Sequence, residues 1–261
     1  WNRTRAKAEP LASHGVTVSN TPAEAVQDAD IVISLLENGP VVGHVLFDQG
    51  VARAMRKGSL FIDMASIQPR EARDHAARLG EMGLAHLDAP VSGGTVGAEN
   101  GTLAILVGGR PEDFAQAQPV FAACGRATHV GPHGAGQLTK LANQMIVGIT
   151  IGAVAEALLF AAKGGADMAK VREAIQGGFA DSRILQLHGL RMVERDFAPR
   201  GRMAVQLKDM RNALATAGEI GFDAPITALF ETLYAEGVDH GLGELDHSGL
   251  FVELASRNAM Q

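Results

Sequence analysis

Cysteine, tryptophan and tyrosine are almost absent from this sequence of 261 residues, which holds one of each. The single cysteine, Cys124, excludes an internal disulfide, and its apolar helical surroundings favour a small core residue. A chain that needs no disulfide suits a reducing compartment, so we expect a cytoplasmic protein. The scarcity of Trp and Tyr argues against an aromatic-rich binding surface, whereas the 31 glycines favour tight turns and close backbone approach.

Charge of one sign is not concentrated anywhere in the chain. Lys and Arg number 23 against 29 Asp and Glu, a formal net charge of −6, and no basic run offers phosphates a continuous strip. The most apolar run, Met145–Ala155, is followed by Glu156 and is shorter than the roughly 20 residues that span a bilayer. We therefore expect no nucleic-acid partner, no membrane partner and no transmembrane segment.

Motifs of metal and hydrolytic chemistry are also missing. His129 and His133 have the four-residue spacing of a helical metal site, but Gly131-Pro132 lies between them and breaks the helix that this spacing requires. No Gly-x-Ser-x-Gly motif is present, which leaves a hydrolase triad without support. The sequence thus predicts neither a bound metal nor a catalytic triad.

The chain begins at Trp1, without an initiator Met, an opening strand or a glycine-rich turn. A doubly wound nucleotide-binding fold opens with a strand, a Gly-rich turn, a helix and a second strand, and Asn2-Arg3-Thr4 fits the end of that second strand. Asn2 then stands where an acid would hold a ribose 2′-hydroxyl, and Arg3 favours a 2′-phosphate. We expect the phosphate-binding loop to lie upstream of Trp1; the alternative reading of this segment is a frayed terminus.

Short β-branched runs alternate with helical segments in the first half of the chain. Segments that are almost wholly apolar, such as Ile31–Leu36, are typical of parallel strands covered on both faces. The alternation predicts an α/β domain with a Rossmann-like doubly wound parallel sheet. The expected strands are 16–18, 31–36, 60–63, 84–87, 103–107 and 127–130, and the expected helices are 21–29, 69–82 and 111–124.

The second half shows no convincing strand. One helix is predicted from about Ala135 to Lys163, where Gly164-Gly165 stops it. Further expected helices are 168–176, 205–220, 226–236 and 247–255. We therefore predict two domains, an N-terminally incomplete nucleotide-binding domain over residues 1–132 and an all-helical domain over residues 133–261.

A polar turn follows one of the expected strands. In the segment Asp88–Ala98, Ser92 is followed by Gly93 and Gly94, which together expose a hydroxyl and unshielded backbone N–H groups to a carboxylate. The carboxyl end of a strand is where open α/β folds bind ligands. An ordinary turn explains the pattern equally well.

A group of polar residues lies near the start of the long apolar helix that the sequence predicts. Gly136, Lys140, Asn143 and Gln144 share one helical face, and a buried lysine is costly without a purpose. Its ammonium can exchange a proton with a carbonyl oxygen, an amide one turn away can hold it, and Gly136 would let a flat ring approach. The competing interpretation is a lysine whose stem lies along apolar surface while its charge reaches solvent.

Taken together, Asp88–Gly109 and Gly134–Gln144 resemble the β-hydroxyacid dehydrogenase family, over essentially the whole chain. The resemblance implies hydride transfer between a nicotinamide cofactor and a small 3-hydroxy acid or its semialdehyde. Asn2 and Arg3 predict that NADP is preferred and NAD possible, and no metal is expected. It also implies a small carboxylate-bearing substrate and a homodimer or homotetramer built on the helical domain. Three motifs favour the subgroup that reduces tartronate semialdehyde to glycerate: 140–144, 177–182 and 246–248.

Site residues are carried over from the family one by one. Lys140 matches the catalytic lysine and Asn143 its supporting amide, and Ser92, Gly93 and Gly94 match the turn that binds the substrate carboxylate. Leu36, Ser66 and Lys208 match cofactor contacts of the family. Asn2, Arg3 and Thr4 are further expected cofactor contacts, from their position at the end of the expected second strand.

The sequence departs from the family pattern at three places. The Gly-rich loop is not in it, Glu37 stands where the family usually has Pro, and Gln144 stands where Asn is common. Without the family, Lys208-Asp209 would be an exposed helical ion pair. The alternatives are a 3-hydroxyisobutyrate dehydrogenase, an imine reductase, against which Lys140 argues, and a non-catalytic homologue, against which Lys140 and Asn143 argue.

Overall fold

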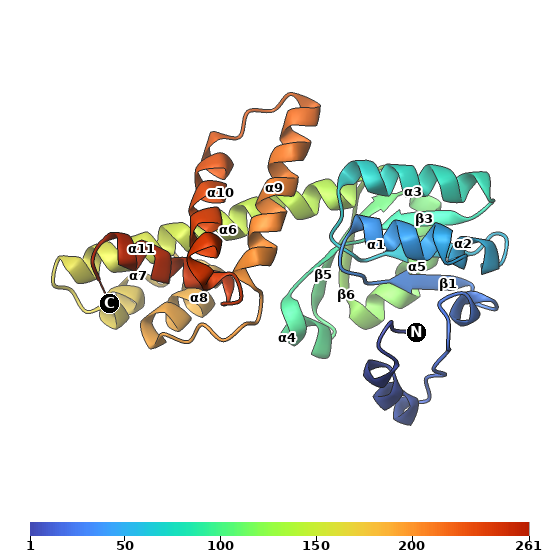
Figure 1. Ribbon diagram of the computed structural model, residues 1–261, viewed down its shortest axis with the longest axis horizontal. Helices are drawn as coiled ribbons and strands as arrows, with labels where there is room; N and C mark the ends of the chain where they lie inside the picture. Colours follow the sequence, from blue (N-terminus) through green and yellow to red (C-terminus); the bar gives the residue numbers. More distant parts are fainter. Residues whose placement is uncertain (261) are drawn as a thin grey trace. The chain divides into compact units, whose positions relative to one another are not determined.

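A computed structural model describes residues 1–260, which form two compact units divided between Lys140 and Leu141. The first unit contains a six-stranded sheet in the order β1-β2-β3-β5-β4, with β6 beside β5. Helices α3 and α5 pack against its strands (Figure 1). The strands are β1 (Ile31–Ser34), β2 (Leu60–Asp63), β3 (Ala85–Asp88), β4 (Val91–Ser92), β5 (Leu103–Gly109) and β6 (Gly125–Gly131).

The sheet is mixed, which corrects the prediction that all of its strands are parallel. β1, β2 and β3 run parallel, but β5 is antiparallel to both β3 and β4, and β6 is parallel to β5. The reason is the short connection Gly93–Thr102, because a parallel pairing needs a crossover of about a dozen residues or more. The Rossmann-like fold class is otherwise confirmed.

Helices connect the strands of the first unit and cover the sheet. In α3, Pro69 occupies the first turn and Gln68 and Glu71 form a capping box, while residues three and four apart, such as Ala72, Ala76 and Leu79, face the core. The helices are α1 (Gly39–Gly43), π-helix η4 (His44–Asp48), α2 (Val51–Ala54), α3 (Pro69–Glu81), α4 (Gly94–Glu99) and α5 (Pro111–Cys124). Short 3-10 turns lie at η1 (Arg5–Lys7), η2 (Glu9–His14) and η3 (Glu24–Val26).

Two predictions near the N-terminus are wrong. Residues 16–18 form no strand, and the helix predicted over 21–29 is reduced to the single turn η3. The expected cap is present, since the Glu24 amide donates to Thr21 Oγ1 at 3.2 Å. A cap alone does not sustain a short helix, because helical stability in proteins comes mostly from packing, and in η3 only Val26 is buried.

The second unit is helical, as predicted. Its core gathers buried side chains from most of its helices, among them Leu158, Met192 and Phe251. α9 and α10 pack side by side as a hairpin (Figure 1). The helices are α6 (Ala135–Lys163), which starts in the first unit, α7 (Met168–Ile175), α8 (Arg183–Glu194), α9 (Met203–Ile220), α10 (Pro225–Gly237), η5 (Val238–Leu242), η6 (His247–Gly249) and α11 (Leu250–Arg257).

Helix α6 is long and apolar enough in composition to cross a membrane, although its longest uninterrupted apolar run is too short to do so. Glu156 interrupts the run without making the helix polar overall. Side chains along one face, including Ile151, Ala155 and Leu158, belong to the core of the second unit, and this packing accounts for much of the composition. Its other face leaves Ile146 and Phe160 exposed.

Candidate functional site

The carboxyl end of β3 is joined to the start of α6 by a buried carboxylate. Asp88 is fully buried, and its two oxygens accept hydrogen bonds from the amides of Gly134 at 2.8 Å and Gln137 at 2.9 Å. Burial raises the pKa of Asp88 to about 6, against the lowering effect of these backbone bonds. Asp88 therefore fixes where the helix that carries Lys140 begins.

A second contact holds the loop after β2 to the same helix. The buried side chain of Gln137 accepts from the Ile67 amide at 3.0 Å and donates to the Ala65 carbonyl at 2.8 Å. Ser66, one of the predicted cofactor contacts, is the half-buried residue between these two. Sequence reasoning missed Gln137, because a glutamine in a helix carries no signal that its partners lie about 70 residues upstream.

Glycines make the close contact between this helix and the sheet possible. A Cβ on Gly136 would collide with the carbonyl oxygens of Asp88 and Leu106, and one on Gly108 would lie 2.7 Å from the Gly136 nitrogen. Gly136 is buried. The expectation that Gly136 admits a flat ligand ring is therefore wrong, since its missing side chain serves the packing of helix against strand.

The Ser92 turn lies where β4 gives way to α4. Ser92 is half-buried and pairs with Ala104 of β5, while Gly93 and Gly94 have φ angles of 139° and 63°. Both angles lie in the region that favours glycine, and a Cβ on Gly93 would also approach Leu103 Cδ2 to 3.1 Å. The backbone conformation thus requires glycine at these two positions.

Lys140 and Asn143 are half-buried residues of α6, one on each side of the division between the units. Helical geometry places side chains three residues apart on the same face. In the second unit, Asn143 Nδ2 donates to Gln144 Oε1 at 2.9 Å, and Gln144 Nε2 donates to Asp209 Oδ2 at 2.8 Å. Gln144, which stands where the family commonly has Asn, therefore links Asn143 to the Asp209 carboxylate.

Lys208 belongs to the same group of side chains. Its ammonium lies 3.2 Å from Asp209 Oδ1, and the Asp209 side chain is 4% exposed whereas that of Lys208 is 35% exposed. The interpretation of Lys208-Asp209 as an exposed surface pair is wrong, because the carboxylate is interior. The structure thus brings together Asn143, Gln144 and Lys208 around Asp209, a residue to which the sequence assigned no role.

The remaining predicted contacts lie in the first unit. Leu36 is half-buried just after β1, and Ser66 follows β2, the parallel neighbour of β1, so both lie at the carboxyl edge of the sheet. Asn2, Arg3 and Thr4 are exposed, and the Thr4 amide donates to Asn2 Oδ1 at 2.9 Å in a tight turn.

Two groups of side chains from distant parts of the sequence have the spacing of metal ligands, namely His86, Asp88 and His133, and His188, Asp246 and His247. Neither was visible in the sequence. In the first, Asp88 already caps α6; in the second, Asp246 is bound by Arg191 at 3.1 Å, a cation that opposes a metal ion. The prediction that the protein binds no metal remains a prediction.

Two known families match the chain, one in each half. The family described as the NAD binding domain of 6-phosphogluconate dehydrogenase covers residues 1–132, and the one described as the NAD-binding of NADP-dependent 3-hydroxyisobutyrate dehydrogenase covers residues 134–254. A 2-hydroxy-3-oxopropionate reductase of Escherichia coli K12 is 43% identical over 93% of this chain and 84% of its own length.

The chain is also similar to enzymes named 3-hydroxyisobutyrate dehydrogenase. A 3-hydroxyisobutyrate dehydrogenase of Pseudomonas aeruginosa is 35% identical over 92% of this chain and 83% of its own length. The solved structure of Mycobacterium tuberculosis 3-hydroxyisobutyrate dehydrogenase with L-serine has a TM-score of 0.88 and 32% identity, covering 97% of this chain and 88% of that one.

A Rossmann-like sheet whose sequence matches a dinucleotide-binding family, followed by a helical unit, defines a nicotinamide-dependent oxidoreductase. The chain belongs to the 3-hydroxyisobutyrate dehydrogenase family and is an NAD(P)-dependent hydroxyacid dehydrogenase, similar to 2-hydroxy-3-oxopropionate reductase. The family, the oxidoreductase activity and the nicotinamide cofactor predicted from the sequence are confirmed.

Proposed function

We propose that this enzyme reduces tartronate semialdehyde to glycerate with NADPH. The observation that carries the proposal is the 43% identity to an enzyme named 2-hydroxy-3-oxopropionate reductase, of which the chain covers 84%. The Lys140–Gln144 segment, from which the subgroup was predicted, forms the start of the long helix α6. The residue roles that follow are part of the proposal.

The cofactor would be held by Leu36, Ser66 and Lys208, with Asn2, Arg3 and Thr4 at its adenosine ribose. The residues present fit this group, because Leu36 and Ser66 remain partly exposed at the carboxyl edge of parallel strands, where dinucleotides bind. The Lys208 side chain is partly exposed, so that its ammonium could bind a phosphate. When bound, the cofactor supplies the hydride that reduces the aldehyde carbon.

The Ser92 turn would hold the substrate carboxylate. Ser92 offers a hydroxyl donor, and Gly93 and Gly94 expose backbone N–H groups that no side chain covers. A carboxylate fixed there leaves the aldehyde end of a small substrate as the part that reacts.

Lys140 would act on the reacting oxygen. As the aldehyde carbon gains hydride, charge develops on its oxygen, and the Lys140 ammonium stabilises this charge and donates the proton that completes the alcohol. Asn143, one turn along α6, would orient the substrate through its carboxamide. In the oxidative direction the same lysine, as a neutral amine, accepts the hydroxyl proton.

A substrate panel tests this function in the full-length enzyme. We expect kcat/KM with NADPH to be at least tenfold higher for tartronate semialdehyde than for methylmalonate semialdehyde. The reverse order would identify a 3-hydroxyisobutyrate dehydrogenase, reduction of a cyclic imine an imine reductase, and cofactor binding without turnover a non-catalytic homologue.

Preference for NADPH over NADH is the finer part of the cofactor proposal, and it depends on Asn2 and Arg3. A guanidinium binds the 2′-phosphate of NADPH, whereas an acid at position 2 would bind a free 2′-hydroxyl. The double variant Asn2→Asp/Arg3→Ala should therefore reverse the ratio of kcat/KM for the two cofactors. Equal values in the unmodified enzyme would refute the preference.

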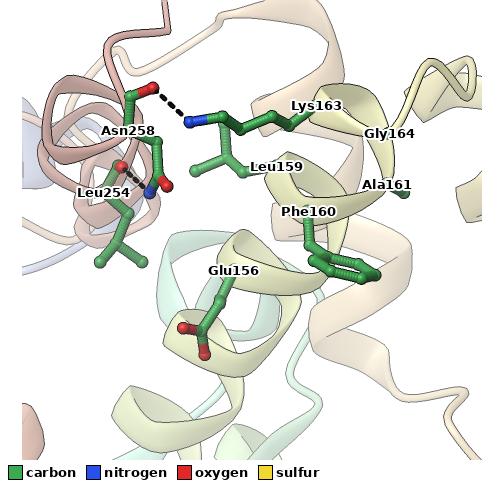
Figure 2. Close-up of a pocket in the computed structure, with 8 residues that line it drawn as sticks. All are labelled: Glu156, Leu159, Phe160, Ala161, Lys163, Gly164, Leu254 and Asn258. Carbon is green, nitrogen blue, oxygen red and sulfur yellow. Dashed lines mark hydrogen bonds between the residues drawn. The ribbon is translucent and has the colours of Figure 1, made fainter.

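We also propose a homodimer or homotetramer. Phe160 on α6 is 81% exposed and Ile146 is 66% exposed. Phe160 lines a cavity of about 610 Å³ between the end of α6 and α11, where Lys163 Nζ donates to the Asn258 carbonyl at 2.9 Å (Figure 2). Exposed apolar surface of this kind favours a partner, and a second copy is the partner proposed.

The domain division at 132/133 and the cytoplasmic location stay predictions.

A further inference from the structure

The side chain of Asp209 is buried and contacts two polar side chains, which its position in the sequence does not predict. It lies in α9 of the second unit, is 3% exposed, and has two different neighbours, Gln144 Nε2 at 2.8 Å from Oδ2 and Lys208 Nζ at 3.2 Å from Oδ1. An interior carboxylate is costly unless it is paired. One neighbour, Lys208, is a proposed cofactor contact. The other, Gln144, is hydrogen-bonded to Asn143, for which a role at the substrate is proposed.

The charge of Asp209 determines how Gln144 is oriented. A carboxylate can only accept hydrogen bonds, so the Gln144 carboxamide must present its Nε2 to Asp209 and keep Oε1 on the opposite side. Gln206 supports this arrangement, because its Oε1 accepts from Gln144 Nε2 at 3.4 Å while its own Nε2 donates to the Gln144 backbone carbonyl at 3.0 Å. Gln144 is therefore held as a donor toward Asp209 and as an acceptor elsewhere.

The orientation of Gln144 is passed on to Asn143. Gln144 Oε1 accepts from Asn143 Nδ2 at 2.9 Å, which fixes the amide nitrogen of Asn143 on that side. The carboxamide oxygen of Asn143 is then the atom that points away from Gln144. This oxygen accepts a hydrogen bond from a hydroxyl or an ammonium, whereas a reversed amide would present a donor.

We propose that Asp209 is a positioning residue that orients Asn143 through Gln144 and holds the Lys208 ammonium at the same time. The proposal rests on the proposed function, which places Asn143 at the substrate and Lys208 at the cofactor. One carboxylate thereby controls substrate orientation and cofactor affinity by two separate routes. Because Asn143 presents an acceptor, it can bind the 2-hydroxyl that tartronate semialdehyde and glycerate both carry, and the proton of the reacting hydroxyl stays available to Lys140.

The first test is Asp209→Asn in the full-length enzyme, since asparagine keeps the shape and removes the charge. We expect kcat to fall about tenfold, KM for glycerate and KM for the semialdehyde both to rise, and the Kd for NADPH, measured by fluorescence, to rise about fivefold. The matched control is Glu253→Gln, another interior carboxylate in the same unit, bonded to His240 at 2.8 Å and to Arg257 at 2.9 Å. It should lower the Tm and leave the kinetic constants unchanged.

Two double variants separate the routes. In a Gln144→Leu background, Asp209→Asn should cause little further loss of kcat but still raise the Kd for NADPH. In a Lys208→Met background, Asp209→Asn should lower kcat but no longer change that Kd. Such non-additivity is the signature of groups that act through each other.

Other outcomes overturn the proposal. If Asp209→Asn behaved like Glu253→Gln, with a lower Tm and unchanged kcat and Kd, Asp209 would be structural only. If the unmodified enzyme reduced none of the semialdehydes, the proposed function would fail, while the NADPH Kd would still decide the Lys208 route. The side-chain amide NMR signals of Asn143 and Gln144 would then decide the other route, since they should move in Asp209→Asn and stay in place in Glu253→Gln.

Discussion

Lys140 is the residue on which the proposed chemistry depends most. Negative charge develops on the aldehyde oxygen only during hydride transfer, so an ammonium placed there stabilises the transition state more than the ground state. We expect Lys140→Ala to reduce kcat about 100-fold or more, with little change in cofactor affinity. Lys140→Arg should also be impaired, because a guanidinium is larger and does not readily give up a proton. Stopped-flow measurement of hydride transfer at saturating substrate provides the test.

The competing interpretation makes Lys140 a surface lysine whose stem lies along α6. In that case alanine would be nearly silent in both rate and stability. A hydride-transfer rate for Lys140→Ala within about threefold of the unmodified enzyme, well below the effect expected of a general acid, would remove Lys140 from the mechanism.

His86 makes the stability of the protein depend on pH. Its ring is 2% exposed beside Phe61, and neither ring nitrogen has a hydrogen-bond partner among residues 1–260. Burial, followed by the nearby His133 and His75, lowers the pKa of His86 to about 3. The unfolded state binds the proton more tightly, so this histidine lowers stability as the pH falls from about 6.5 toward 3.

His86→Phe should therefore raise the Tm and reduce the loss of stability between pH 6.5 and 5. Thermal unfolding measures the Tm, and urea unfolding at several pH values measures the pH dependence of the free energy of unfolding. His240→Gln supplies a control of opposite sign, because the Glu253 carboxylate raises the pKa of His240, so that removing this histidine should cost stability below about pH 6.5 and progressively less above it. An unchanged pH dependence in His86→Phe would contradict the assignment.

Asp63 acts in the opposite direction to His86. Burial raises its pKa to about 7, in spite of the bond from the Ala65 amide at 3.0 Å. The folded state then holds the proton more tightly, so this group contributes stability at low pH that is lost as the pH rises from about 4 through 7. The two residues have to be separated by single variants, since their effects partly cancel near pH 5.

Sequence patterns indicated candidate residues for the chemistry, whose roles stay predictions, more readily than the partners of those residues. Lys140, Asn143 and Ser92 stand in motifs that are local in the sequence, so they could be singled out without a structure. Asp209 could not, because a carboxylate beside a lysine on a helix usually marks an exposed pair, and its burial depends on α6 packing against α9. His86 shows the same limit, since an alternating strand pattern does not reveal a histidine without hydrogen-bond partners.

At the scale of elements, the Gln137 contact should determine how firmly the loop after β2 is held. Gln137→Leu leaves the Ile67 amide and the Ala65 carbonyl without the partner that they have now, and each such buried group costs about 1–3 kcal/mol. We expect a total loss of about 2 kcal/mol or more in the free energy of unfolding, together with a raised KM for NADPH through Ser66. Urea denaturation and steady-state kinetics measure the two effects.

Gln186→Leu is the matched control for the Gln137 variant. Gln186 is exposed and donates to Asp181 at 3.2 Å, so its loss should change the unfolding free energy by less than about 0.5 kcal/mol. A Gln137→Leu variant as stable as this control would show that the contact does not hold the loop.

Helices with a strong periodic pattern of apolar residues were predicted closely. Short elements, and elements whose stability depends on packing, were missed. The predicted helices 111–124 and 135–163 agree with α5 and α6. Helix α8 was overlooked although Ser182 caps it, with the Leu185 amide donating to Ser182 Oγ at 2.9 Å. The sequence pattern also could not predict that β5 runs antiparallel to β3, because the alternation of strands and helices does not indicate the direction of a strand.

At the scale of the whole molecule, the exposed face of α6 should support self-association. Phe160→Glu places a charge on a surface that the proposed partner copy would cover, and burying an unpaired charge is strongly unfavourable. We expect the parent protein to be a dimer or tetramer and the variant to dissociate at micromolar concentration, as measured by light scattering after gel filtration. Leu11→Glu, at an exposed apolar residue of the first unit, should leave the assembly intact. A monomeric parent would refute the proposed assembly.

The Asp88 cap has a consequence for how the longest helix opens. Amides at the beginning of a helix have no acceptor within it and usually exchange their hydrogens with water quickly. Here Gly134 and Gln137 donate to a carboxylate that is sealed from solvent. In hydrogen–deuterium exchange the first turn of α6 should therefore be protected for as long as the sheet itself, and the helix should fray from its Lys163 end.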